Sequence, residues 1–188
     1  FGYLMMSTTP RYNRIQIILH WLIAAILLGM IGLGLFMVEL PKESELPVGE
    51  ESVRAFYFLL HKSIGITVAM LIVLRIVWRL THKAPPLPTD LPKWQQKAAS
   101  AVHGLLYLLM LAVPFSGFMQ SMYSKYSTKF WGLELPRLAE ADPVLRESFS
   151  QLHVCLAFAI IALIVLHIAA AIKHRLAGNE IANRMSLK

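Results

Sequence analysis

Residues 152–172 read LHVCLAFAIIALIVLHIAAAI and contain no aspartate, glutamate, lysine or arginine. A helix needs about 20 such residues to cross roughly 30 Å of hydrocarbon. This segment is therefore predicted to be a transmembrane helix. It also contains two histidines, His153 and His167, although ionisable residues are rare inside membrane spans and are functional by default.

Three more blocks of this kind lie upstream, at about 15–38, 56–80 and 99–122. The chain is 56% hydrophobic and only 15% charged, which is more apolar surface than a soluble domain of 188 residues can bury. We therefore predict an all-α fold, a single transmembrane four-helix bundle covering residues 1–188. The blocks are too long for the apolar core of a cleaved signal peptide. The single cysteine, Cys155, excludes an intrachain disulfide, and we expect a small buried apolar residue there.

The charged residues predict the orientation of the bundle. A net charge of +7 would suggest nucleic acid binding in a soluble protein, but here the charges lie at the ends of the spans, so no nucleic acid partner is expected. The end with the basic excess carries only Asp90 and Glu180 as acidic residues. Its basic residues are Arg11, Arg14, Arg75, Arg79, Lys83, Lys93, Lys97, Lys173, Arg175, Arg184 and Lys188. By the positive-inside rule, both termini and the 81–98 loop are expected in the cytoplasm.

Prolines and glycines predict local irregularities. The 81–98 connection is short and proline-rich, so the second and third helices should be antiparallel neighbours. Pro114 should bend the third helix, and Gly117 should permit close approach of a neighbour or a cofactor. The longer connection at about 123–150 is expected on the outer surface, as a cap or docking site.

Five histidines fall inside the predicted spans: His20, His61, His103, His153 and His167. A single one could simply bond to a backbone carbonyl of a neighbouring helix, but five make that explanation weak. Depth in the bilayer separates them into groups, because a cofactor held from two helices needs both imidazoles at one level. At 1.5 Å per residue, His20 and His167 both lie about 9 Å from the cytoplasmic boundary.

The same depth estimate places a second group in the other half of the membrane. His61 and His153 both lie about 10 Å from the outer boundary, measured from Arg54 and Arg146. The fourth helix carries one member of each pair, and 14 residues of helix return to within about 40° of the same face after a rise of about 21 Å. We therefore expect two bis-histidine sites, one in each leaflet.

Haem iron is the metal that this arrangement favours. Haem iron accepts two axial imidazoles, and a bundle interior excludes water. Zinc would need three or four convergent ligands, which each leaflet lacks. With both axial positions filled, the iron should be low-spin and closed to oxygen, so that electron transfer is favoured over oxygen activation.

Other polar residues are candidates for a supporting role. Cations that could pair with anionic haem propionates are Arg11, Arg14, Arg75 and Arg79 inside and Lys62 outside, although each could also reach the lipid headgroups. Arg75, the deepest in its span, is the best candidate. His103 lies level with the inner pair. It could replace His20 or His167 as a ligand, or line a pocket where its imidazole bonds to a quinone or exchanges a proton, or serve helix packing only.

Five segments together resemble the bacterial cytochrome b561 family of four-helix di-haem membrane cytochromes. They are YNRIQIILHW, LHKSIGI, AVHGLLYLLMLAVPFSG, SQLHV and VLHIAAAIKHR, and the resemblance extends from about Arg11 to Arg175. It implies two haems b in the bacterial inner membrane, with His20 and His167 as one axial pair and His61 and His153 as the other. It also implies electron exchange with ubiquinone and, in some members, oxidation of superoxide at a basic outer surface.

Alternative functions make different predictions. The first outer loop is acidic, so it should repel superoxide, although it would suit a basic periplasmic partner protein. The chain could instead be a membrane-anchor haem subunit that conducts electrons for a partner oxidoreductase. A proton-coupled transporter, in which the histidines relay protons, would be colourless and should carry carboxylates in its spans.

Overall fold

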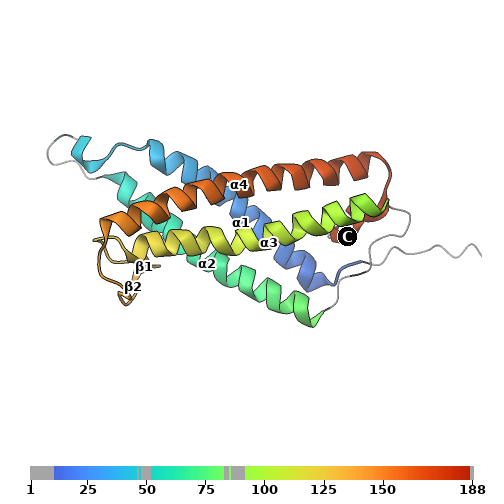
Figure 1. The fold of residues 1–188 in the computed structure, drawn as a ribbon, viewed down its shortest axis with the longest axis horizontal. Coiled ribbons are helices and arrows are strands. Elements are labelled where there is room, and N and C mark those ends of the chain that lie inside the picture. The colour runs from blue at the N-terminus through green and yellow to red at the C-terminus, as the bar shows by residue number, and fades with distance from the viewer. Residues whose placement is uncertain (1–10, 46, 48–51, 83–84, 86–91, 187–188) are drawn as a thin grey trace, which may run out of the picture.

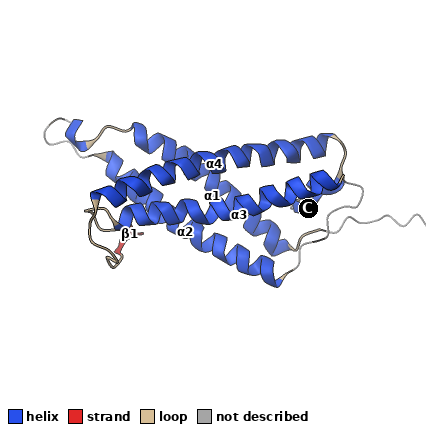
Figure 2. Ribbon diagram, viewed as in Figure 1, coloured by secondary structure: helices blue, strands red, loops and turns tan. Residues whose placement is uncertain are grey.

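The computed structural model describes residues 11–45, 47, 52–82, 85 and 92–186. Over these residues the fold is all-α apart from one small hairpin, as predicted (Figures 1 and 2). Each of the four long helices is apolar enough to cross a membrane. The elements are α1 (Arg14–Glu39), η1 (Glu43–Glu45), α2 (Val53–Thr81), α3 (Lys93–Met122), β1 (Lys129–Phe130), β2 (Leu133–Glu134), α4 (Pro143–Leu176) and η2 (Glu180–Met185).

The helices extend beyond the apolar blocks from which they were predicted. The largest difference is at α4, which begins at Pro143 rather than near residue 152. The Asp142 side chain caps this end by accepting hydrogen bonds from the backbone amides of Val144 and Leu145, and proline suits the first turn of a helix. The predicted ends were therefore wrong where a helix leaves the apolar layer and continues with polar residues.

All four helices contribute to one narrow core. Its buried members are Ile23, Val68, Ile72, Met110 and Ile160. Many other large apolar side chains are exposed, as expected when lipid is the solvent. Cys155 is also exposed on α4, so the prediction of a buried cysteine was wrong. In a membrane span a small apolar residue needs no burial, because lipid is as apolar as the protein interior.

The helices pack mainly as two pairs, α3 with α4 and α1 with α2. Figure 1 shows α3 and α4 running side by side, with α1 and α2 crossing behind them. The start of α1, the end of α2, the start of α3 and the end of α4 lie at one end of the bundle, and the hairpin lies at the other. Helix α3 continues past Pro114 to Met122.

The connection between α3 and α4 contains a hairpin that rests on α2. Its two-residue turn is Trp131-Gly132, and both residues have positive φ, at 47° and 89°. The Trp131 amide donates to Ser63 Oγ at 3.0 Å, and its indole Nε1 donates to Thr67 Oγ1 at 3.0 Å. This connection was predicted to lie over the outer surface, but its hairpin reaches along α2 to residues that follow His61.

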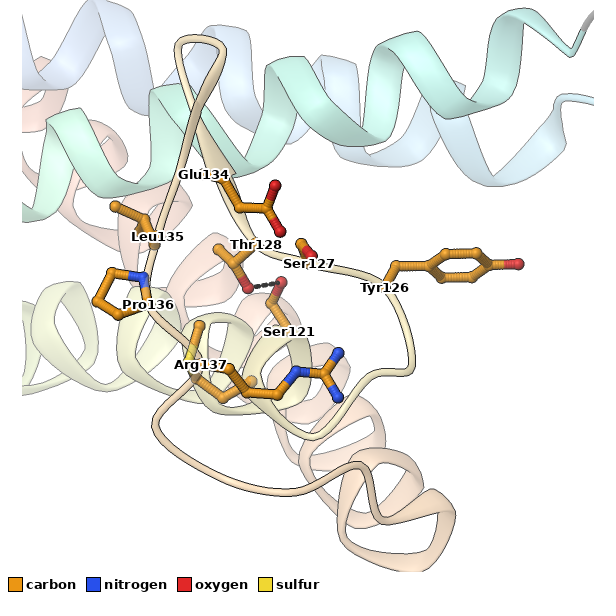
Figure 3. Close-up of a pocket in the computed structure, with 9 residues that line it drawn as sticks. Ser121, Tyr126, Ser127, Thr128, Glu134, Leu135, Pro136 and Arg137 are labelled. Atoms are coloured by element: carbon orange, nitrogen blue, oxygen red, sulfur yellow. Dashed lines mark hydrogen bonds between the residues drawn. The ribbon is translucent and has the colours of Figure 1, made fainter.

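A pocket lies under the same connection, at the end of α3 (Figure 3). Its volume is about 430 Å³, and its walls include Ser121, Thr128, Glu134 and Arg137. The hydroxyls of Ser121 and Thr128 are hydrogen-bonded to each other at 2.7 Å. Arg137 donates to the carbonyls of Ser124 and Lys125. The polar groups of this pocket therefore hold the connection itself together.

The C-terminal segment folds back against the start of α1. The indole of Trp21 donates to the carbonyl of Met185 at 2.8 Å, and Arg11 donates to the carbonyl of Ser186 at 2.8 Å. Arg184 is buried, with its guanidinium 5.7 Å from the centre of the Tyr12 ring. This segment covers the end of the bundle nearest to His20.

Candidate functional site

One histidine pair joins α2 to α4. The ring centres of His61 and His153 are 6.2 Å apart, and their planes are inclined at 84°. Both side chains are half-buried. They lie in the half of the bundle that contains the hairpin, as the depth estimate from Arg54 and Arg146 predicted.

A second pair joins α1 to α4 in the opposite half. The ring centres of His20 and His167 are 6.3 Å apart, and their planes are inclined at 69°. Helix α4 thus supplies one histidine to each pair, and the structure brings together the same partners that the sequence heights predicted.

The spacing of both pairs fits a metal held between two imidazoles. An imidazole nitrogen binds a first-row metal at about 2 Å and lies about 1 Å from the ring centre, so two rings on opposite sides of one metal have centres roughly 6 Å apart. His61 adds a second indication, because its Nδ1 atom is buried and has no hydrogen-bond partner among the described residues. The ring spacing of both pairs therefore suits a bis-imidazole centre. No group of three or more histidine, cysteine, aspartate or glutamate side chains suited to a metal occurs among the described residues.

Helix α3 holds His153 from the side. His153 Nδ1 lies 2.9 Å from the carbonyl oxygen of Val113 and 3.2 Å from Ser116 Oγ. Sequence reasoning missed these two contacts, because a backbone carbonyl and a buried serine leave no signal in the sequence.

A cationic and aromatic cluster surrounds the inner pair. Arg75 Nη2 lies 3.1 Å from His20 Nδ1, and Arg75 Nε donates to the Tyr107 hydroxyl at 3.3 Å. The Arg79 guanidinium lies 5.8 Å from the centre of the Tyr107 ring and 5.9 Å from that of Tyr12. Tyr107 was not predicted, although it lies one turn from His103 on the same face of α3.

The remaining candidates differ in their proximity to the pairs. The ring centre of His103 is 5.4 Å from that of His167, so it lies level with the inner pair as predicted. Lys62 follows His61 in α2 and is half-buried. Arg14 is exposed at the first residue of α1.

Four apolar helices that carry an imidazole pair in each half of the bundle are the arrangement expected of a membrane cytochrome of the b type. A sequence profile described as prokaryotic cytochrome b561 matches residues 11–187. The chain belongs to this family of membrane haem b proteins, which function in electron transfer. Family membership therefore favours haem-based electron transfer over the proton-transporter alternative.

Three curated relatives show the extent of the similarity. Cytochrome b561 homolog 2 of Escherichia coli K12 is 36% identical over 174 residues, which cover 89% of this chain and 86% of the relative. Cytochrome b561 homolog 1 of the same organism is 29% identical, covering 87% and 89%. A Yersinia pestis protein named "Probable superoxide oxidase CybB" is 26% identical, covering 87% and 88%.

Proposed function

We propose that this chain is a single-domain di-haem cytochrome b of the bacterial inner membrane that conducts electrons across the bilayer and exchanges them with ubiquinone. His20 and His167 are the axial ligands of the inner haem, and His61 and His153 are those of the outer haem. The observation that carries the proposal is the pair spacing of 6.3 and 6.2 Å, which recurs in opposite halves of one bundle.

The two sites together form a path for electrons. Haem bound between two imidazoles supplies an iron that takes up and releases one electron. The two sites lie in opposite leaflets in this proposal, because helix α4 rises by about 21 Å between His153 and His167. The apolar helices exclude water from the sites, and filled axial positions keep oxygen from the iron.

The residues around the inner pair support quinone exchange there. Arg75 and Tyr107 carry donors suited to the carbonyl oxygens of a quinone, and His103 can accept or supply the proton that accompanies the electron. Arg14, Arg75 and Arg79 are also the cations available to the propionates of the inner haem, and Lys62 is the one beside the outer haem. The basic end that holds the inner pair faces the cytoplasm, together with both termini.

A second candidate function is that of a haem subunit that conducts electrons for a periplasmic partner. The connection between α3 and α4 favours it, because apolar side chains there are exposed. Tyr126, Leu133 and Leu138 are 65%, 70% and 74% exposed. One relative is named as a probable superoxide oxidase, but the acidic residues between α1 and α2 would repel the superoxide anion here.

Haem quantitation with a reduced-minus-oxidised spectrum tests the main proposal. The purified protein should contain two haems b, and the His20→Ala and His153→Ala variants should each retain one. His82→Ala is the control and should retain both, because the His82 ring stacks on Trp78 at the end of α2 and belongs to neither pair. Absence of haem from the wild type would refute the proposal. Full haem in His20→Ala would transfer that ligand role to His103.

A further inference from the structure

Helix α3 supplies no axial ligand in the proposed function, yet two of its residues lie within hydrogen-bond distance of His153. The Val113 carbonyl oxygen lies 2.9 Å from His153 Nδ1. The Ser116 hydroxyl lies 3.2 Å from the same nitrogen and donates to the same carbonyl at 2.8 Å. Ser116 is completely buried, so water does not compete for these bonds.

These contacts fix the position of the proton on the His153 ring. A carbonyl oxygen can only accept, so Nδ1 must carry the hydrogen that faces Val113. The Ser116 hydroxyl hydrogen is committed to the same carbonyl, so its oxygen faces Nδ1 as a second acceptor. A neutral imidazole has one hydrogen, which leaves Nε2 with a free lone pair. This is the tautomer that can bind a metal through Nε2.

Gly117 adds a steric constraint on the same ring. A Cβ atom at this position would lie 3.0 Å from His153 Cε1 and 3.1 Å from its Nδ1. These distances are shorter than ordinary van der Waals contact, so a larger residue would require the imidazole to shift from the position in which it contacts Val113. The hydrogen bond and the glycine therefore act together, one orienting the ring and the other leaving room for it.

We propose that Ser116 and Gly117, with the Val113 carbonyl, are the positioning residues of the outer site. They hold His153 in the tautomer and orientation that an axial ligand needs before the cofactor binds. The proposal rests on the proposed function, in which His153 is that ligand. A hydrogen bond from Nδ1 also raises the basicity of a ligating imidazole, so these residues tune the outer centre as well as orienting its ligand.

Redox titration and low-spin ferric EPR of the purified holoprotein test this role. Ser116→Ala should retain both haems, but the midpoint potential and EPR signal of one haem should shift while those of the other stay unchanged. Gly117→Ala should bind the outer haem roughly 10- to 100-fold more weakly, as expected when the support of a ligand is lost. A role in helix packing alone would lower the stability of the fold without singling out one haem.

Two controls match these substitutions. Ser148→Ala removes a serine that donates to its own helix at Val144, away from both pairs. Gly29→Ala adds a methyl group where nothing lies within 4 Å. Both controls should behave as wild type. Wild-type potentials and haem content in both Ser116→Ala and Gly117→Ala would overturn the positioning role, even if His153→Ala loses one haem. If His153→Ala retains two haems, the ligand assignment itself is wrong.

Discussion

The paired histidines differ in what contacts their Nδ1 atoms. His153 faces acceptors, and His61 Nδ1 has no partner among the described residues. His20 Nδ1 faces the Arg75 guanidinium, which can only donate, so the hydrogen of a neutral His20 ring lies on Nε2. A metal at His20 Nε2 therefore requires Arg75 or the ring to turn. An Arg75 released in this way would be free to pair with a propionate.

The first prediction at this scale concerns His103. His103→Leu should retain both haems but slow the oxidation of the reduced protein by a water-soluble ubiquinone analogue about 10-fold or more, since a positioned acid or base contributes roughly 10²–10⁴-fold to proton transfer. Stopped-flow absorbance at the haem band measures the rate. His174→Leu, at the end of α4, is the control and should oxidise at the wild-type rate. An unchanged rate in His103→Leu would remove this residue from the quinone site.

At the scale of elements, the long apolar blocks predicted four helices, because the length and hydrophobicity of a block can be read directly from the sequence. The helix ends were less predictable, since α4 starts at the Asp142 cap and not where its apolar residues begin. The hairpin was not predicted. Its strands are two residues long, and its turn places Trp131 at a positive φ that a bulky residue rarely adopts. Contacts of Trp131 with Ser63 and Thr67 of α2 hold the hairpin in place. A local sequence pattern cannot predict such contacts, because the partners lie far apart in the chain.

A prediction for the hairpin follows from its turn. Gly132 has φ of 89°, and a Cβ atom added there would meet nothing within 4 Å, so Gly132→Ala adds strain without a clash. A side chain in the left-handed region costs roughly 1–2 kcal/mol, which should open the hairpin about 10-fold more often. Limited trypsin digestion at Lys129 in detergent should therefore be about 10-fold faster. Gly178→Ala, also at positive φ but beyond α4, is the matched control and should leave cleavage at Lys129 unchanged. Equal rates in Gly132→Ala and wild type would mean that the α2 contacts alone fix the hairpin.

At the scale of the molecule, the histidine pairing was predictable because helix rise and charged span ends convert residue numbers into depth. Which rings meet at each level depends also on how each helix is rotated about its axis. On α4 the two histidines share one face of the helix. The ring of His103 lies closer to His167 than that of His20 does, so depth alone could not assign the inner ligands. The supporting contacts of Arg75, Tyr107 and Ser116 depend on how neighbouring helices are rotated, which no periodicity in the chain specifies.

The orientation of the whole bundle gives the last prediction. Basic residues concentrate at the end that holds the start of α1 and the end of α4, so the positive-inside rule places that end in the cytoplasm. In a Cys155→Ser background, Ala141→Cys and Ala177→Cys introduce one exposed thiol at each end of α4. A membrane-impermeant maleimide should label Ala141→Cys in intact spheroplasts, but Ala177→Cys only after lysis. The reverse pattern would place the inner pair on the periplasmic side. The cytoplasmic cations assigned to that site would then face the wrong compartment, and quinone exchange would have to be reassigned to the opposite leaflet.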